Sequence, residues 1–341
     1  MPQPIKHDLL FPSEKEIDAL FSAMRGKHIA VVGDLMLDKY IWGAVTRISP
    51  EAPVPIVHVA NESECLGGAA NVSNNLHHLG ATAIPIGVVG EDLNGDHLIK
   101  LAQEAGFRTD GIIRDAARPT TVKSRVIAHN QHVVRVDRED GRDIEAAVAR
   151  RIIGFLESIA NDLDAIIIED YNKGLLTAGL IESIIALAKQ RDIPVTVDPK
   201  FSNFMAYKDV TVMKPNRKEI EEALAIKIED ETSLHAAAQK LKERLACANA
   251  LITLGEKGMF LLDDRDRQTT IPTVARRVHD VSGAGDTVIA TLTLALAAGS
   301  PVVEAAYLAN HAAGVVVGEI GAVPITPEDL KQALLSTGAS A

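Results

Sequence analysis

Short apolar runs alternate with amphipathic segments along most of the chain. A run of four to eight apolar residues predicts a buried strand, and apolar residues spaced three or four apart predict a helix. The predicted strands cover 28–32, 84–89, 165–168, 195–197, 211–213 and 250–253. The predicted helices cover 13–24, 69–79, 93–105, 147–158, 178–189 and 284–317. This alternation indicates an α/β fold with a doubly wound, mostly parallel sheet, built as a single domain over 1–341.

Two segments depart from this rhythm. The segment 40–59 carries Pro50, Pro53 and Pro55 and ends in an alternating apolar pattern, which excludes a helix and favours an edge strand. A second strand-like run covers 121–136. We therefore expect a small β excursion, formed by about 38–60 and 120–137, beside the main sheet. Such an excursion is marginally stable in water, so we expect its own copy to cover it in a homodimer.

Charge and cysteine content narrow the possible functions. The chain of 341 residues has 35 basic and 46 acidic side chains, a formal charge of 35 − 46 = −11. No basic run is present, so binding to nucleic acid or to an anionic membrane is not expected. The scarcity of cysteine suits a reducing compartment, and no signal peptide or transmembrane stretch is visible. We expect a soluble cytoplasmic protein.

The segment 280–287, DVSGAGDT, carries the most informative chemistry. Gly283 and Gly285 allow a tight turn that exposes N–H groups at the start of an apolar helix, where the helix dipole favours anions. A carboxylate beside a phosphate site suits a base that takes a proton from an attacking hydroxyl, which would be Asp286. The alternative is a first-turn acid that the helix dipole stabilises.

Three further segments contain residues suited to binding. The segment 67–71, GGAAN, opens a helix and offers the amide of Asn71 to a hydroxyl. Asn216 and Glu219 share one face of a first helical turn, where they could hold a hydrated Mg²⁺ or form a capping box. The segment 253–258, TLGEKG, is a glycine turn that forms a hairpin or covers a nucleotide.

Together these segments resemble the ribokinase or PfkB family of sugar kinases, and no Walker-type phosphate loop is present. Val281 departs from that family's signature, which usually has threonine there. The segment 47–55, RISPEAPVP, narrows the resemblance to the heptose 7-phosphate kinases, as do VVGDLMLD and DPK. That resemblance implies a ribokinase-like fold with a β lid, and ATP-dependent phosphorylation of D-glycero-β-D-manno-heptose 7-phosphate at O1. The product would lead to ADP-heptose and lipopolysaccharide core. No H-x-G-H nucleotidyltransferase motif follows, so the resemblance is to the stand-alone kinase.

The resemblance also implies a role for each matching residue. Asp286 would be the catalytic base, and the N–H groups of Gly283, Ala284 and Gly285 would bind the transferring phosphoryl group. Glu219 would hold Mg²⁺ through water. The ATP-binding residues would be Asn216, Arg217, Lys218, Glu219, Thr253, Gly255 and Gly258.

The sugar side is implied in the same way. Its hydroxyl-binding residues would be Asp34, Asp38, Gly67, Gly68 and Asn71. Candidates for the 7-phosphate are Arg47, Lys123, Arg125, Arg135, Lys173 and Lys200, each of which could instead be a solvated surface charge. Two alternatives stay open: another PfkB-type kinase for a sugar or nucleoside, and a non-catalytic regulator that binds sugar on this fold.

Overall fold

The computed structural model describes residues 13–129, 131–275, 278–319, 321 and 323–338. Its large sheet has nine strands in the order β13-β12-β11-β10-β9-β8-β1-β4-β5, and the strands from β11 to β5 run parallel. These strands are β1 (His28–Gly33), β4 (Thr82–Gly90), β5 (Ile112–Asp115), β8 (Ala165–Glu169), β9 (Val195–Asp198), β10 (Val212–Met213), β11 (Asn249–Thr253), β12 (Met259–Leu262) and β13 (Gln268–Ile271). The prediction of an α/β, mostly parallel sheet is confirmed.

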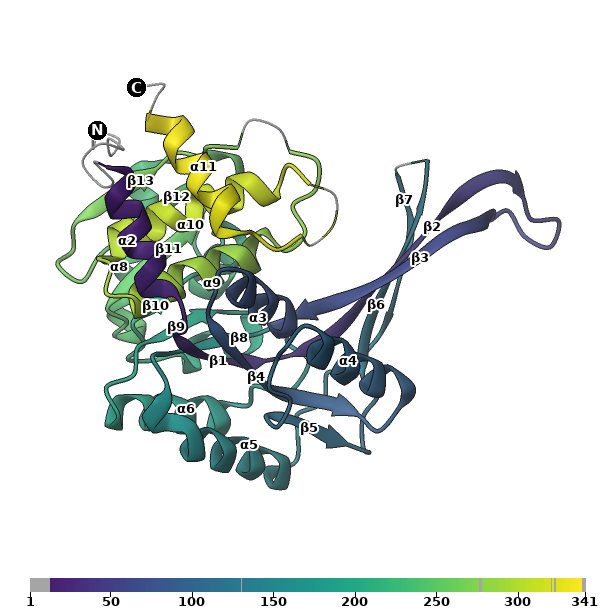
Figure 1. Cartoon of the computed structure of the whole chain (residues 1–341), viewed down its shortest axis with the longest axis horizontal. Coiled ribbons are helices and arrows are strands. Elements are labelled where there is room, and N and C mark those ends of the chain that lie inside the picture. Colours follow the sequence, from purple (N-terminus) through teal and green to yellow (C-terminus); the bar gives the residue numbers. More distant parts are fainter. Residues whose placement is uncertain (1–12, 130, 276–277, 320, 322, 339–341) are drawn as a thin grey trace.

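Helices cover both faces of this sheet (Figure 1). The helices are α2 (Glu14–Met24), α3 (Ala69–His78), α4 (Leu93–Glu104), α5 (Ala146–Ile159), α6 (Ala178–Gln190), α7 (Arg217–Leu224), α8 (Glu231–Leu245), α9 (Ala284–Ala297), α10 (Val302–Val316) and α11 (Pro327–Gly338). Successive residues of β1 point to opposite faces: Ile29 and Val31 pack with α2, α3 and α9, whereas Ala30 and Val32 pack with α5, α6 and α8. This is the doubly wound arrangement, with an apolar core on each face.

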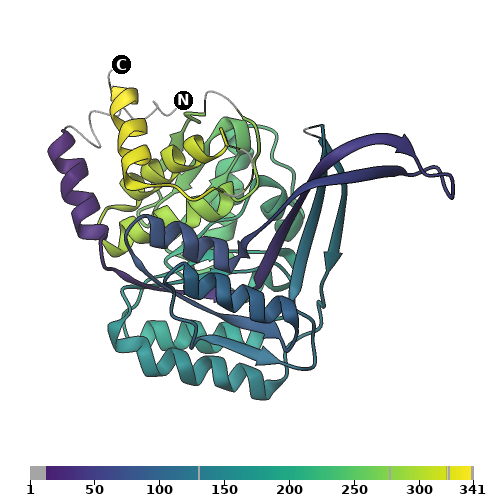
Figure 2. The ribbon, with the colours of Figure 1, turned by 45° about the vertical axis from the view of Figure 1, so that its right-hand side comes forward.

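A second sheet of four strands projects from one side of the body (Figures 1 and 2). Its strands are β2 (Leu35–Ile48), β3 (Pro55–Gly68), β6 (Thr121–Ala128) and β7 (Gln131–Arg138), in the order β3-β2-β6-β7. The segments 38–60 and 120–137 both lie in this small sheet. Each segment is a hairpin rather than one strand, because the chain reverses between Ile48 and Pro55 and again after Ala128.

Several helices and strands of the α/β body differ from the predicted elements. The expected helix over 284–317 is divided into α9 and α10, because Gly299 has a left-handed φ of 91° and Pro301 precedes the second helix. Strand β5 was missed. So was the antiparallel pair β12–β13, which forms the edge of the sheet after the glycine turn.

No helix among the described residues is long and apolar enough to cross a membrane.

Candidate active site

A cavity of about 940 Å³ opens at the carboxyl ends of the parallel strands, where α/β folds generally bind their ligands. Five parts of the chain meet there: the start of α9, the start of α7, the turn after β11, the end of β9 and the loop after β8. The residues predicted for ATP and for catalysis that line this cavity are Asn216, Glu219, Thr253, Gly255, Gly258, Gly283, Ala284, Gly285 and Asp286.

Asp286 lies in the first turn of α9 and is buried at the floor of the cavity. Its Oδ2 accepts a hydrogen bond from Nδ2 of Asn71 (2.7 Å), and its Oδ1 accepts one from the hydroxyl of Tyr171 (2.7 Å). Burial raises the pKa of Asp286 to about 6, although both hydrogen bonds favour the charged form. A carboxylate with this pKa is ionised at neutral pH and able to accept a proton.

The turn before Asp286 is shaped for an anion. Gly283 adopts a left-handed φ of 78° as the N-cap of α9, a conformation that glycine adopts without strain. The N–H of Ala284 donates to the carbonyl of Val281 (3.3 Å), so it serves the turn itself. A Cβ at position 285 would lie 3.6 Å from Oδ2 of Asp198 and 3.7 Å from Nζ of Lys214, so Gly285 packs close to this buried ion pair. The positive end of the helix favours a phosphoryl group here.

Three charged residues missed by the sequence analysis lie at the ends of adjacent strands, and two of them, Asp198 and Lys214, line the cavity. Asp198 ends β9 and pairs with Lys214 (2.7 Å), and both side chains are buried. Glu169 ends β8 opposite Asp198 in the sheet, and its Oε2 is buried without a hydrogen-bond partner. Burial raises the pKa of Glu169 well above its usual value, and the negative charges of Asp198 and Asp286 add to this effect. The only feature of the sequence that could have identified these residues is that each directly follows a predicted apolar strand.

The start of α7 shows that Asn216 and Glu219 do form a capping box. Oδ1 of Asn216 accepts from the N–H of Glu219 (2.9 Å), and Oε2 of Glu219 accepts from the N–H of Asn216 (2.8 Å). The other oxygen of Glu219, Oε1, pairs with Lys200. Lys200 therefore lies on the cavity wall, and not at a separate site for the far end of a sugar phosphate.

Arg217 and Lys218 do not line the cavity, contrary to their predicted contact with ATP. Arg217 pairs with Glu221 (3.2 Å) and donates to the carbonyl of Ile228. The side chain of Lys218 is 82% exposed and lies 3.7 Å from Glu222. Helical geometry explains both, because residues 217 and 218 point away from the face that carries Asn216 and Glu219.

On the other side of Asp286, the small sheet meets the start of α3. Gly68 has a φ of 58°, and a Cβ there would lie 2.4 Å from the carbonyl of Asp34, so only glycine fits. Gly67 is equally confined, because its Cβ would lie 2.9 Å from the carboxylate of Asp38. This close packing brings Asn71 to Asp286 and Asp38 to Gly67.

Basic side chains gather around Asp38 on the face of the small sheet that turns toward the site. Nη1 of Arg125 lies 3.0 Å from Oδ1 of Asp38, although neither atom has an aligned hydrogen bond. Nζ of Lys123 lies 4.7 Å from the ring centre of Tyr171, and Lys173 pairs with Glu139 (2.7 Å). Burial lowers the pKa of Lys123, and the charges of Lys173 and Arg125 lower it further, against the opposing effect of Asp38. We name Lys123, Arg125 and Lys173 the cation cluster.

Three other predicted sugar-side residues take no part in this cluster. Arg47 is exposed near the outer end of β2, and Arg135 is 59% exposed and pairs with Asp137 (3.0 Å). Asp34 is buried, and its Oδ2 accepts from the N–H groups of Tyr171 (2.8 Å) and Lys173 (3.1 Å). Its carboxylate thus holds a loop of the protein rather than facing a ligand.

Known structures with the same fold are kinases. Phosphofructokinase-2 from Escherichia coli in complex with substrates and products superposes with a TM-score of 0.77 over 91% of this chain and 99% of that one, at 18% identity. Arabidopsis thaliana ribokinase complexed with ribose and ATP gives a TM-score of 0.72 over 91% and 99%, also at 18% identity. At this identity the match establishes the fold alone. The fold is therefore that of the ribokinase-like class.

The sequence places the chain more narrowly. It belongs to the pfkB family of carbohydrate kinases, whose model matches residues 26–329. It is 45% identical over 320 residues to the bifunctional protein HldE of Pelobacter propionicus, and 44% identical over 316 residues to that of Geobacter sulfurreducens. These matches cover 94% and 93% of this chain but 66% and 64% of those proteins, so the chain spans about two thirds of the length of these relatives.

Proposed function

We propose that this kinase transfers the γ-phosphoryl group of ATP to O1 of D-glycero-β-D-manno-heptose 7-phosphate. The 1,7-bisphosphate formed would lead to ADP-heptose and the lipopolysaccharide core. One observation supports this substrate above all: the cation cluster lies one tyrosine ring away from Asp286. A sugar with a phosphate at its far end needs cations there, and this half-buried cluster can supply them if the phosphate displaces the present partners Asp38 and Glu139. The relatives named bifunctional protein HldE are matched over about two thirds of their length. They support a kinase that is joined to a second activity in those proteins.

In this proposal the chain positions two substrates around one carboxylate. Asp286 accepts the proton of the O1 hydroxyl while that oxygen attacks the γ-phosphorus. The N–H groups of Gly283 and Gly285 hold the transferring phosphoryl oxygens, beside the ion pair of Lys214 and Asp198. The nucleotide lies along Thr253, Gly255 and Gly258, which line the same cavity.

The donor atoms present also fit Mg²⁺. Asp198 and Glu219 line the cavity, with Lys214 and Lys200 as their present partners, and the described residues contain no group of three or more metal-ligating side chains. Few carboxylates and several waters are what Mg²⁺ prefers when it is bound with a nucleotide. When bound, Mg²⁺ would neutralise charge on the phosphates of ATP.

Product analysis tests the proposal directly. The protein is incubated with ATP and heptose 7-phosphate, and the products are identified by phosphorus NMR and mass spectrometry. The expected result is a 1,7-bisphosphate and one ADP per sugar. Turnover only with fructose phosphates, ketodeoxygluconate or adenosine would overturn the substrate. If the protein binds ATP and a sugar but phosphorylates none of these substrates, a non-catalytic regulator would be favoured.

Glu219→Gln is expected to raise the Mg²⁺ concentration needed for half-maximal activity several-fold, up to about tenfold, as for other residues that act on a metal through water. Glutamine keeps the capping box, so the stability of α7 should change little. The measurement is a Mg²⁺ titration of the initial rate at saturating ATP. The matched control is Glu222→Gln on the exposed side of α7, beside Lys218. Equal titration curves for both variants and wild type would leave Glu219 with a capping role only.

The protein is expected to form a homodimer through the small sheet. The face of this sheet that points away from the site carries an apolar row, with Ile41, Val126 and Val134 in register. Val134 and Val136 both lie on this face, and their side chains are 49% and 57% exposed. A second copy could bury this row across a twofold axis.

Light scattering measures the mass, which should be twice the 36.5 kDa of one chain at micromolar concentration. Val134→Asp should give monomers, whereas Val323→Asp, at an exposed valine outside the sheet, should not. A monomeric wild-type protein would rule out this assembly.

A further inference from the structure

Tyr171 links three parts of the site. Its hydroxyl donates to Oδ1 of Asp286 (2.7 Å), and its N–H donates to Oδ2 of Asp34 (2.8 Å). Two ammonium groups lie near its ring, with Nζ of Lys123 at 4.7 Å and Nζ of Lys200 at 5.6 Å from the ring centre. Lys123 belongs to the small sheet and Lys200 lines the ATP cavity, so the ring contacts residues of both substrate sides.

We propose that Tyr171 is a positioning residue for Asp286, and that its hydroxyl holds Oδ1 so that the free lone pairs of the carboxylate face the sugar hydroxyl. This inference rests on the proposed role of Asp286 as the base. Asn71 holds Oδ2 in the same way, so one donor binds each oxygen. A carboxylate has about four acceptor positions, which leaves two for the substrate. Rotation about the Cβ–Cγ bond would break both contacts, so the orientation is determined.

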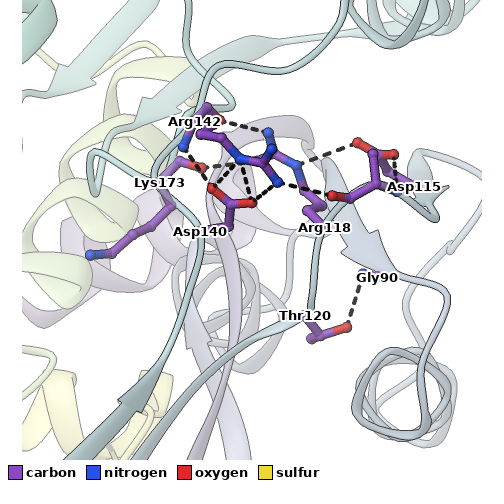
Figure 3. A network of polar contacts seen from close by, with 8 residues as sticks. Gly90, Asp115, Arg118, Thr120, Asp140, Arg142 and Lys173 are labelled. Atoms are coloured by element: carbon purple, nitrogen blue, oxygen red, sulfur yellow. Dashed lines mark hydrogen bonds and ion pairs between the residues drawn. The ribbon is translucent and has the colours of Figure 1, made fainter.

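The loop that carries Tyr171 is itself fixed on two sides, as a positioning role requires. Asp34 holds the N–H groups of Tyr171 and Lys173 from the end of β1. On the other side, Nη1 of Arg118 donates to the carbonyl of Lys173 (3.0 Å) and Nη2 donates to that of Arg142 (2.7 Å) (Figure 3). Between these anchors Asn172 takes a left-handed φ of 55°. Such strain persists only where the surrounding contacts impose it.

The groups that face Asp286 come from several elements. Glu169 and Asp198 approach from the ends of β8 and β9, Lys214 follows β10, and Asn71 lies on α3. Burial raises the pKa of Asp286 and Asp198 raises it further, while the bonds from Asn71 and Tyr171 and the charge of Lys214 lower it. Removing the Tyr171 hydroxyl therefore has one predictable electrostatic result, which is a higher pKa for Asp286.

Tyr171→Phe removes this hydroxyl and keeps the ring. The acid limb of the kcat/KM profile for heptose 7-phosphate should move up by about 0.5–1 pH unit, since each unit is a tenfold change in the ionisation equilibrium. The loss of activity should then be about three- to tenfold greater below the wild-type pKa than above about pH 8. A purely structural role would lower activity by the same factor at every pH.

Tyr207→Phe is the matched control. Its hydroxyl is also buried and donates to Oδ2 of Asp170 (2.7 Å), the neighbour of Tyr171, but it does not touch Asp286. It should leave the acid limb where it is in the wild type. An unshifted limb in Tyr171→Phe, or an equal shift in Tyr207→Phe, would overturn the inference.

A second measurement needs no substrate. Urea unfolding midpoints are compared at about pH 5 and about pH 8 for wild type, Tyr171→Phe, Asp286→Asn and the double variant. Tyr171→Phe should destabilise the protein more at the higher pH, where Asp286 is ionised, and this difference should vanish when Asp286 is Asn. If the difference persists in the Asn background, the positioning role is wrong whatever the substrate. If Asp286→Asn keeps full turnover while the stability coupling is present, the proposed base fails and the contact alone stands.

Discussion

Asp286→Asn is expected to lower turnover by roughly 10²–10⁴-fold, the usual contribution of a general base. Asparagine keeps the size of the side chain and can still accept from Tyr171, but it cannot take a proton from the attacking hydroxyl. ATP binding should remain, because the nucleotide lies along other walls of the cavity. The measurements are single-turnover kinetics with heptose 7-phosphate and a separate titration of ATP binding.

Loss of folding would not explain such a result. The pKa of Asp286 is about 6 in the folded protein and about 4 for an ordinary aspartate in an unfolded chain. The folded state thus binds the proton more tightly, and ionised Asp286 lowers stability as the pH rises through about 4 to 6. At neutral pH the Asn variant escapes this ionisation cost but loses one of the two hydrogen bonds to the carboxylate, and thermal unfolding measures the balance of these two effects.

A buried aspartate elsewhere provides the control. Asp263 follows β12, pairs with Arg267 (2.7 Å) and does not line the cavity. Asp263→Asn should reduce stability and leave turnover per folded molecule unchanged. If Asp286→Asn turns over at nearly the wild-type rate, another group must accept the proton.

The fold was predictable because local patterns report burial. The strand 28–32 and the helix over 178–189 were both found from apolar spacing, and β1 and α6 match them closely. The two strands of each hairpin in the small sheet were not distinguished in the sequence. The alternating pattern at the end of 40–59 does not state which strands pair. The antiparallel edge β12–β13 was missed for the same reason: pairing is a property of distant segments.

The site was predictable where glycines reveal it. The turn before Asp286 and the pair Gly67 and Gly68 need their glycines for conformation or close approach, and such needs are visible in a sequence. Glu169, Asp198 and Lys214 were missed because one charge after an apolar run looks like any strand end. Only the strand order β10-β9-β8 brings these three charges together.

The basic residues proposed for the sugar phosphate also could not be grouped from the sequence. Six basic residues were candidates for the sugar phosphate, and composition could not separate them. The structure places Lys123, Arg125 and Lys173 together, whereas Arg135 points its charge to Asp137 in solvent. Burial distinguishes these groups: Lys123, Arg125 and Lys173 are half-buried, and burial lowers the pKa of Lys123, whereas the side chain of Arg135 is 59% exposed.

The cation cluster leads to the second large effect, which concerns substrate choice. An anionic phosphate between Lys123, Arg125 and Lys173 would take the place of Asp38 and Glu139 as partner of these cations, and the Arg125 fork can bind two phosphate oxygens. Wild type is therefore expected to prefer heptose 7-phosphate to unphosphorylated heptose by at least about tenfold in kcat/KM, or roughly 1.4 kcal/mol. Steady-state kinetics with the two sugars at one ATP concentration measures this ratio.

Lys123→Met removes one charge of the cluster and keeps most of the side-chain volume. It should lower kcat/KM for the phosphorylated sugar by about tenfold or more, the value of a hydrogen bond to a charged group, and leave the free sugar unaffected. Lys39→Met is the matched control, because Lys39 lies in the adjacent strand on the opposite face and pairs with Glu64 (2.5 Å). That variant should keep the wild-type preference. Equal efficiency of wild type on both sugars would mean that the 7-phosphate is not recognised, and the substrate would then be sought among neutral sugars.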